Sequence, residues 1–113
     1  ITNLARLVYA EARGESFTGQ VAVAAVALNR LFSKDFGNTL NEVIFEPGAF
    51  TAVNDGQFYL TPDTVAYEAV RNALNGWDPT GNAVYYWNPK TATNKWIWSR
   101  PIICKIGNHV FAH

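Results

Sequence analysis

The stretch VAVAAVALNRL, residues 21–31, carries an apolar side chain at every position before Asn29. A helix that is apolar on all its sides is buried at the centre of a domain. Its many alanines also allow neighbouring helices to approach closely. We therefore predict a buried central helix over residues 19–32, with Thr18 as its N-cap, and expect the rest of the chain to pack around it.

An amphipathic helix is predicted before the central one, over residues 3–13. At the helical step of ~100° per residue, Leu4, Leu7 and Val8 fall on one face. Gly14 follows and is a natural helix stop. The apolar face of this helix should pack on the core.

Two further helices are predicted from their end signals. Thr39 and Glu42 form a T-x-x-E capping box, which starts a short helix. Residues 61–63, Thr-Pro-Asp, supply an N-cap, a proline at the first helical position and an acid in the first turn. Asn75 and Gly76 close the helix that they open.

Short strands are predicted in four places. FTAV (residues 50–53) reads as a strand that enters an Asn-Asp-Gly turn. AVYYW (83–87), KWIWS (95–99) and the tail GNHVF (107–111) have the aromatic and β-branched content of strands. The sequence thus predicts one α+β domain, mainly helical with a small aromatic-rich β portion.

Composition narrows the class of protein. The chain has 113 residues, and its nine basic residues balance its nine acidic ones, so no positive field attracts nucleic acid. No apolar run approaches the ~18 residues of a membrane helix, so we expect no membrane insertion. Cys104 is the only cysteine, which excludes an internal disulfide and suggests a small core residue. Because the chain lacks an initiating Met, we expect a single domain cut from a longer protein.

Glu11 stands out on the amphipathic helix. It projects at about −20° from Leu4, in the middle of the apolar stripe. Arg13, Arg30 or Arg71 could neutralise such a carboxylate, or it could turn to solvent. Alternatively it is held in a partly apolar cleft, where desolvation penalises the charged form. A carboxyl group that keeps its proton can act as a general acid, most commonly on a glycosidic oxygen.

Aromatic side chains are dense after residue 76, and they offer flat apolar faces with polar edges, to which sugar rings bind. Core packing is the alternative for each of them. They are Trp77, Tyr85, Tyr86, Trp87, Trp96 and Trp98. His109 and His113 lack acidic residues at ligand spacing, so we expect no zinc site. No phosphate-binding glycine loop is present, and we expect no cofactor.

Several long motifs resemble one known family. They are VYAEARGE, GQVAVAAVALNR, EPGAFTAV, ALNGWDPTG, KWIWSRP and IGNHVF. These stretches are similar to the catalytic domain of spore cortex-lytic enzymes, the SleB/CwlJ-type family of cell-wall hydrolases, and lie closest to the SleB side. The resemblance covers nearly the whole chain. It implies a lysozyme-like fold and a separate N-terminal peptidoglycan-binding domain in the longer protein, with residues 1–113 as the single catalytic domain.

The resemblance also implies an activity. The family acts on spore cortex peptidoglycan that carries muramic-δ-lactam during germination, which implies a location in the spore, in the cortex and inner-membrane region outside the cytoplasm. Its SleB members resemble lytic transglycosylases, which cleave the MurNAc–GlcNAc β-1,4 bond and leave 1,6-anhydromuramic ends. The Glu of the AEARGE motif is the catalytic acid in the family, which corresponds to Glu11. We expect a monomer.

Ordinary glycosidases need a second carboxylate. Glu15, Asp55 and Asp78 are the candidates, and none is compelling. Glu15 follows the predicted helix stop and is expected to be structural, accepting backbone or arginine hydrogen bonds beside the cleft. Asp55 and Asp78 sit in turns, where Asp is expected for backbone reasons. A lytic transglycosylase needs no partner carboxylate, because the substrate's own C6 hydroxyl attacks.

Candidate sugar contacts follow from the resemblance, in which the catalytic Glu faces a short β segment and a Tyr-bearing segment. They are Phe50 and Thr51 in the first, Tyr85, Tyr86 and Asn88 in the second, and also Gln57, Trp96 and Trp98. Side chains alternate along a strand, so Tyr85 and Tyr86 face opposite ways, and the sequence leaves open which one is buried.

Two other functions stay open at this point. A non-catalytic peptidoglycan-binding module would also use an aromatic groove, but it has no need of an inward carboxylate such as Glu11. A hydrolytic muramidase on the same fold would use water in place of the C6 hydroxyl.

Overall fold

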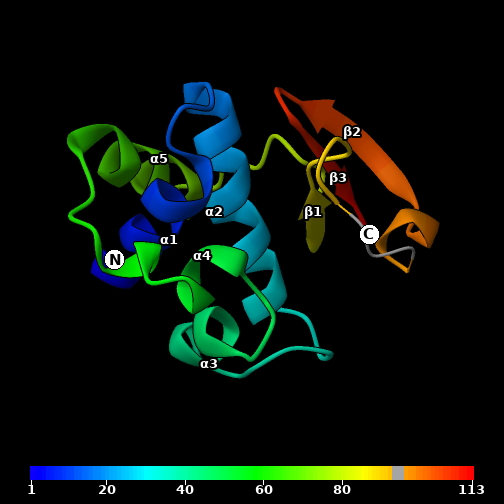
Figure 1. The fold of residues 1–113 in the computed structure, drawn as a ribbon, viewed down its shortest axis with the longest axis horizontal. Coiled ribbons are helices and arrows are strands. Elements are labelled where there is room, and N and C mark those ends of the chain that lie inside the picture. Colours follow the sequence, from blue (N-terminus) through cyan, green and yellow to red (C-terminus); the bar gives the residue numbers. More distant parts are fainter. Residues whose placement is uncertain (93–95) are drawn as a thin grey trace.

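Helix α2 (Phe17–Leu31) runs through the middle of the molecule (Figure 1), and every residue from Gly19 to Ala27 is buried. The computed structural model describes residues 1–92 and 96–113. The central buried helix is confirmed, but its predicted cap is wrong. Ser16 is the N-cap, because its hydroxyl accepts the backbone N–H of Gly19, and Thr18 lies inside the first turn.

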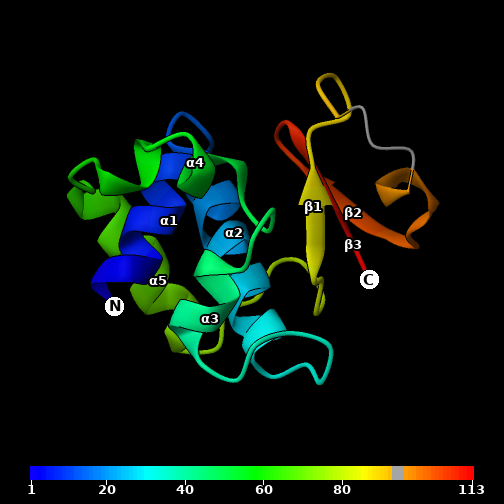
Figure 2. The ribbon, with the colours of Figure 1, turned by 60° about the horizontal axis from the view of Figure 1, so that its bottom comes forward.

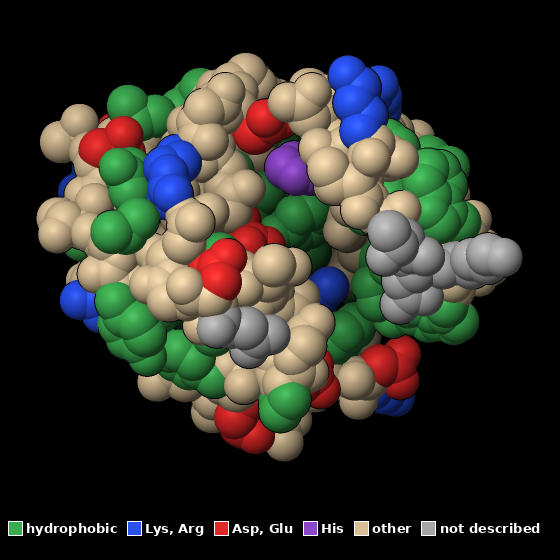
Figure 3. Space-filling view, viewed as in Figure 1, with side chains coloured by type: hydrophobic (Ala, Val, Ile, Leu, Met, Phe, Trp, Pro, Cys, Tyr) green, Lys and Arg blue, Asp and Glu red, His purple; other side chains and the backbone are tan. Residues whose placement is uncertain are grey.

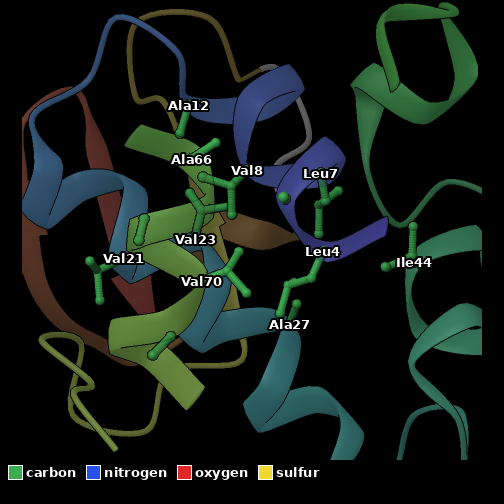
Figure 4. Close-up of a cluster of buried hydrophobic side chains, with 14 of the residues drawn as sticks. Leu4, Leu7, Val8, Ala12, Val21, Val23, Ala27, Ile44, Ala66 and Val70 are labelled. Carbon is green, nitrogen blue, oxygen red and sulfur yellow. The ribbon is translucent and has the colours of Figure 1, made fainter. Parts of the chain in front are cut away.

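Three helices pack against α2. They are α1 (Thr2–Ala12), α3 (Leu40–Phe45) and α5 (Thr64–Leu74). Their apolar side chains point toward one another in Figure 4, where Leu4, Val8, Val23 and Val70 meet. Each of these four is no more than 1% exposed. The core of the helical part therefore lies between α1, α2 and α5.

Side-chain hydrogen bonds identify the N-cap residues of α3 and α5. The hydroxyl of Thr39 accepts the N–H of Glu42, as the capping box predicts. At α5 the predicted cap is displaced, since the carboxylate of Asp63 accepts the N–H of Ala66 at 2.8 Å. Asp63 rather than Thr61 is thus the N-cap of α5.

The strand predicted over residues 50–53 is wrong. Phe50 is extended, but a short helix, α4 (Thr51–Asn54), follows it, and the 3₁₀ helix η1 (Gln57–Tyr59) comes next. A first-turn N–H of a helix has no partner within the helix and needs an acceptor elsewhere. For the N–H of Ala52 that acceptor is Glu11, distant in sequence, at 3.0 Å.

The β portion is one antiparallel sheet with the strand order β1-β3-β2. Its strands are β1 (Tyr85–Trp87), β2 (Ile102–Ile106) and β3 (His109–Ala112). The strands predicted over residues 83–87 and 107–111 are confirmed in β1 and β3, and β2 was not predicted. In β2, Cys104 is half-buried beside a small apolar cluster that includes Phe111.

The strand predicted over residues 95–99 is also wrong. Its first residue lies outside the described residues, Trp96 lies in a turn, and the remaining three residues form the 3₁₀ helix η2 (Ile97–Ser99). The carbonyl of Trp96 accepts both the backbone N–H and the hydroxyl of Ser99, at 3.0 and 2.6 Å, which closes a tight turn.

Helix α2 separates the two parts of the molecule. Figures 1 and 2 show α1 and α5 on one side of it and the three strands on the other. On the sheet side, Ala22 and Val26 pack against Ala83 and Phe111. The predicted α+β class, mainly helical with a small β portion, is confirmed. None of the helices in the described ranges has the length and apolarity that crossing a membrane requires.

Candidate active site

A cleft of about 830 Å³ lies between the helical part and the sheet. Figure 3 shows it as a central hollow with acidic, basic and histidine side chains around it. One wall comes from the end of α1, the end of α2 and the start of α4. The other comes from β1, the first residue of β3 and the segment around η2. A cleft with both polar and aromatic lining can accommodate a carbohydrate.

Glu11 lines this cleft from the last turn of α1. Its Oε2 accepts the N–H of Ala52 at 3.0 Å, and its Oε1 accepts the hydroxyl of Tyr86. Within the described part of the chain, Glu11 forms no ion pair. Arg13 donates to Gln57 instead, and Arg71 pairs with Glu68, away from the cleft.

Tyr86 is held against Glu11 by the packing of its ring. The ring centroid lies 6.4 Å from that of Phe50, 5.8 Å from that of Phe111 and 5.1 Å from that of His109. Burial, together with the adjacent charge and hydrogen bond of Glu11, raises the pKa of Tyr86 well above its ordinary value. The hydroxyl therefore keeps its own proton at any pH near neutrality.

Both hydrogen bonds of the Glu11 carboxyl group can persist when Glu11 gains or loses a proton. A backbone N–H can only donate, so the Oε2 atom that accepts from Ala52 is an acceptor in both states. A tyrosine hydroxyl can donate to a carboxylate or accept from a carboxylic acid. Glu11 can therefore lose and regain a proton without losing either partner.

His109 lines the cleft beside Tyr86. Its Nδ1 lies 3.7 Å from Oε1 of Glu15. Burial lowers the pKa of His109, although the charges of Glu15 and Glu11 oppose that shift. The ring is thus neutral at neutral pH and adds a polar but uncharged wall to the cleft.

Glu15 is not part of the cleft wall. Its two carboxylate oxygens accept the backbone N–H and the side-chain amide of Asn108, at 3.1 and 2.9 Å. Burial would raise the pKa of Glu15, but the hydrogen bonds from Asn108 and the nearby His109 hold it below its usual value. Glu15 ties the β2–β3 turn to the start of α2, and none of its hydrogen bonds comes from an arginine.

Five of the eight predicted sugar contacts line the cleft. They are Thr51, Tyr85, Tyr86, Asn88 and Trp96. Tyr85 and Tyr86 both line the cleft although side chains alternate along β1, which is an edge strand of the sheet.

The other three predicted contacts lie elsewhere. Phe50 is 2% exposed and sits beneath the cleft, stacked on Arg30 and Tyr86. Gln57 accepts from Arg13 outside the cleft. Trp98 packs edge-on against Trp87, with ring centroids 5.8 Å apart, and is not among the cleft residues.

The family of this chain is decided by sequence comparison. A family model described as Cell Wall Hydrolase matches residues 14–112. The chain belongs to the cell wall hydrolase family. The match begins just after Glu11, so the family model itself does not cover that residue.

Similar members of the family are cortex-lytic enzymes. A spore cortex-lytic enzyme of Bacillus cereus is 66% identical over 108 residues, which are 96% of this chain and 42% of that protein. One from Oceanobacillus iheyensis is 63% identical over 96% of this chain and 39% of its own length. The cell wall hydrolase CwlJ of Bacillus subtilis is 31% identical over 96% of this chain and 80% of its length. The chain thus spans less than half of the cortex-lytic enzymes.

Two solved structures share the fold. The catalytic domain of the germination-specific lytic transglycosylase SleB from Bacillus anthracis superposes with a TM-score of 0.94 at 63% identity, covering 99% of this chain and 92% of that one. The catalytic domain of the Bacillus cereus SleB protein gives 0.90 at 62% identity, covering 100% and 91%. The resemblance to the SleB/CwlJ-type family is confirmed.

Sequence reasoning did not anticipate several cleft residues. Arg30 and Glu46 are charged, His109 is polar, and Phe36 adds an aromatic ring. Arg30 carried a signal in the sequence, since it is a cation at the end of a long apolar run. In the structure it is only 7% exposed. Glu46 and His109 carried none, because only the fold brings them to the cleft.

The three carboxylates considered as partners for Glu11 do not line the cleft. Asp55 accepts the N–H of Gln57 in its turn, and Asp78 anchors the loop before β1. Glu46 does line the cleft and is exposed. Among the described residues, no cluster of three His, Cys, Asp or Glu side chains could hold a metal ion.

Proposed function

We propose that residues 1–113 are the catalytic domain of a longer, germination-specific lytic transglycosylase. It cleaves the MurNAc–GlcNAc β-1,4 bond of spore cortex peptidoglycan and leaves 1,6-anhydromuramic ends, with Glu11 as the single general acid and base. The environment of Glu11 carries this proposal. One carboxyl group faces a polar and aromatic cleft, with both oxygens held and no arginine paired to it.

The first step breaks the glycosidic bond. Glu11 donates its proton to the bridging oxygen, which leaves as the C4 hydroxyl of the glucosamine. Positive charge develops at C1 of the muramic acid as the bond lengthens. The ionised Glu11 is then stabilised by the hydroxyl of Tyr86 and the N–H of Ala52, which are already oriented toward it.

The second step closes the anhydro ring. The C6 hydroxyl oxygen of the same muramic acid bonds to C1, and its proton passes to Glu11. No water is consumed and Glu11 regains its starting state. One carboxyl group is sufficient for this sequence, whereas inverting and retaining hydrolases each need two.

The glycan lies along the cleft in this proposal. Tyr85 and Trp96 provide aromatic faces for sugar rings, and Thr51 and Asn88 provide polar partners. Phe50 supports the floor from below, and Glu15 holds the β2–β3 turn in place. Both act on structure rather than on substrate.

The names of the relatives, which are spore cortex-lytic enzymes, support a setting in the spore cortex. We propose that the substrate is cortex peptidoglycan with muramic-δ-lactam, met in the spore outside the cytoplasm, and that the domain acts as a monomer. The remainder of the longer protein would supply an N-terminal peptidoglycan-binding domain.

A hydrolytic muramidase is the second candidate, and the position of Glu46 favours it. Glu46 lines the same cleft as Glu11 and could activate a water molecule. The products separate the two reactions, because transglycosylation leaves anhydro ends and hydrolysis leaves reducing ends.

The test is the muropeptide pattern released from decoated spores, read by mass spectrometry. Glu11→Gln keeps the shape of the side chain and removes its proton, and should lower the rate by about 10²–10⁴-fold. Glu42→Gln, an exposed change of the same kind on α3, is the matched control and should retain the wild-type rate. An active Glu11→Gln variant would reject the proposal.

Two further outcomes decide between the alternatives. Loss of activity in Glu46→Gln together with reducing-end products would favour hydrolysis. A wild-type domain that binds spores and leaves them turbid would be a binding module only.

A further inference from the structure

Arg30 is a buried cation on the floor of the cleft. It lies in the last turn of α2, lines the cleft and is 7% exposed. In the described part of the chain it forms no ion pair. Transfer of an unpaired cation out of water is costly, so a buried guanidinium without a carboxylate calls for other partners.

The protein provides only part of what this guanidinium needs. Its Nε donates to the carbonyl of Val84 at 2.7 Å. The Cζ atom of Arg30 lies 4.8 Å from the ring centroid of Phe50, 5.1 Å from that of Phe36 and 5.6 Å from that of Tyr85. These contacts hold the plane of the guanidinium in one orientation.

The two terminal nitrogens of Arg30 have no acceptor among the described residues, although Nε has one. Among the described residues, the fully buried side-chain atoms without a partner are on Trp87 and His109, so the terminal nitrogens of Arg30 are not fully buried. Arg30 lines the cleft, so a ligand bound in the cleft can reach these nitrogens. Their N–H groups form a planar fork, which suits a carboxylate or a carbonyl oxygen.

The charge of Arg30 is retained in this setting. Burial lowers the pKa of Arg30, and the neighbouring Tyr86, Tyr85, Glu46 and Glu11 oppose that shift. A guanidinium stays protonated at any pH at which the fold exists. Glu11 and Arg30 line the same cleft, so a glycan bound there can contact both residues.

A glycan strand offers two kinds of carbonyl group. The acetamido carbonyl is neutral and occurs on both sugars, and neutral donors are sufficient to bind it. The lactyl substituent at C3 occurs on muramic acid alone, and it carries a carboxyl carbon that is free, amide-linked or closed into a lactam. A fixed cation in the same cleft as Glu11 pairs with the free carboxylate form of that substituent, and its planar fork also suits the amide or lactam oxygen.

We propose that Arg30 is a specificity-determining residue that donates hydrogen bonds to the carboxyl-derived oxygen of the C3 lactyl substituent. It thereby selects which sugar of the alternating strand occupies the position next to Glu11. This inference rests on the proposed function for the identity of the glycan.

Binding of two disaccharides to the 113-residue chain tests the inference, by NMR titration. They are N-acetylglucosaminyl-N-acetylmuramic acid and chitobiose, which differ by the lactyl group. Neither contains the muramic acid–glucosamine bond, so the result does not depend on whether Glu11 is the acid.

Arg30→Lys keeps the cation and removes the fork. We expect it to lower the affinity for the muramyl disaccharide by about 10- to 100-fold and the affinity for chitobiose by less than about 3-fold. Arg100→Lys is the matched control. Arg100 also stacks on Tyr85 and donates through Nε to a backbone carbonyl, but it does not line the cleft. It should not alter the ratio of the two affinities.

An equal loss for both disaccharides would mean that Arg30 only supports β1 through Val84, and it would overturn the inference. No loss for either would overturn it as well.

A ligand-side comparison covers the case in which the Arg30 variants do not fold. The wild-type chain should bind the muramyl disaccharide at least about 10-fold more tightly than the same disaccharide with its carboxyl reduced to an alcohol. Equal affinities would refute the role of Arg30.

Discussion

Asp78→Asn should destabilise the loop that carries β1. Oδ1 of Asp78 accepts the backbone N–H and the hydroxyl of Thr80, at 2.8 and 2.6 Å. Oδ2 accepts the amide of Asn29 and the N–H of Asn82, both at 2.9 Å. Asn82 has a φ of 73°, a left-handed conformation that is uncommon for a residue with a side chain. The carboxylate therefore fixes the chain on α2 just before Tyr85.

The magnitude follows from these four bonds. An amide has one acceptor oxygen, so in either orientation its NH₂ group faces a backbone N–H, that of Thr80 or that of Asn82. A buried donor left without an acceptor costs about 1–3 kcal/mol. Since Asp78 is half-buried, we expect a loss of about 2 kcal/mol in the free energy of unfolding. In a domain of this size that lowers Tm by about 8 °C.

Asp63→Asn is the matched control for this prediction. Asp63 accepts one hydrogen bond, from the N–H of Ala66, and an asparagine oxygen caps a helix about as well. Its free energy of unfolding should change by less than about 0.5 kcal/mol. Urea unfolding followed by circular dichroism measures both variants against wild type.

The effect of pH on the Asp78 variant has a defined sign. Burial would raise the pKa of Asp78, but the hydrogen bonds from Thr80, Asn29 and Asn82 hold it below its usual value. Its contribution is complete above the unfolded-state value of about 3.9 and is lost as the pH falls through the lowered folded-state value. The difference in the free energy of unfolding between wild type and Asp78→Asn should therefore become smaller below about pH 4. A gap no larger than that of Asp63→Asn, or one independent of pH, would refute the reasoning.

Two other changes test the site and its support. Tyr86→Phe removes the hydroxyl that donates to Glu11 and should lower the rate of cortex cleavage by about 10- to 100-fold. Its Tm should change little, since the ring contacts remain. An unchanged rate would show that Tyr86 does not orient the acid. Gly107→Ala should cost about 2 kcal/mol in urea unfolding, because the residue has a φ of 57° and its Cβ would lie 2.7 Å from Oε1 of Glu15. Gly48→Ala, with a φ of 77° and open space around it, should cost only about 1 kcal/mol, and equal losses would contradict the steric argument.

The family resemblance carried by the motifs identified the catalytic candidate and its setting. Local signals were sufficient for most of the helices. Periodicity placed α1 and α2, and the Thr39 capping box and the Asn75–Gly76 stop set two helix ends. Even the position of Glu11 followed from the helical period. These features depend on residues a few positions apart, so the sequence alone is enough to read them.

The features that the sequence did not predict depend on contacts between residues far apart in the chain. Residues 51–54 fold as a helix whose Ala52 N–H donates to Glu11, 41 positions earlier in the chain. The side chain of Tyr86 meets Glu11 across a separation of 75 residues. The conformational propensities of neighbouring residues predict neither contact.

The sequence by itself determined a buried central helix, a small aromatic sheet and one carboxylate in the wrong place on an apolar stripe. Tertiary structure alone decided that Arg30, Glu46 and His109 share a cleft with that carboxylate, and that Phe50, Gln57 and Trp98 do not. The physical reason is that helix periods and caps arise from bonds within a few residues. A cleft is formed by packing two separate layers against α2, and its lining is set by long-range contacts.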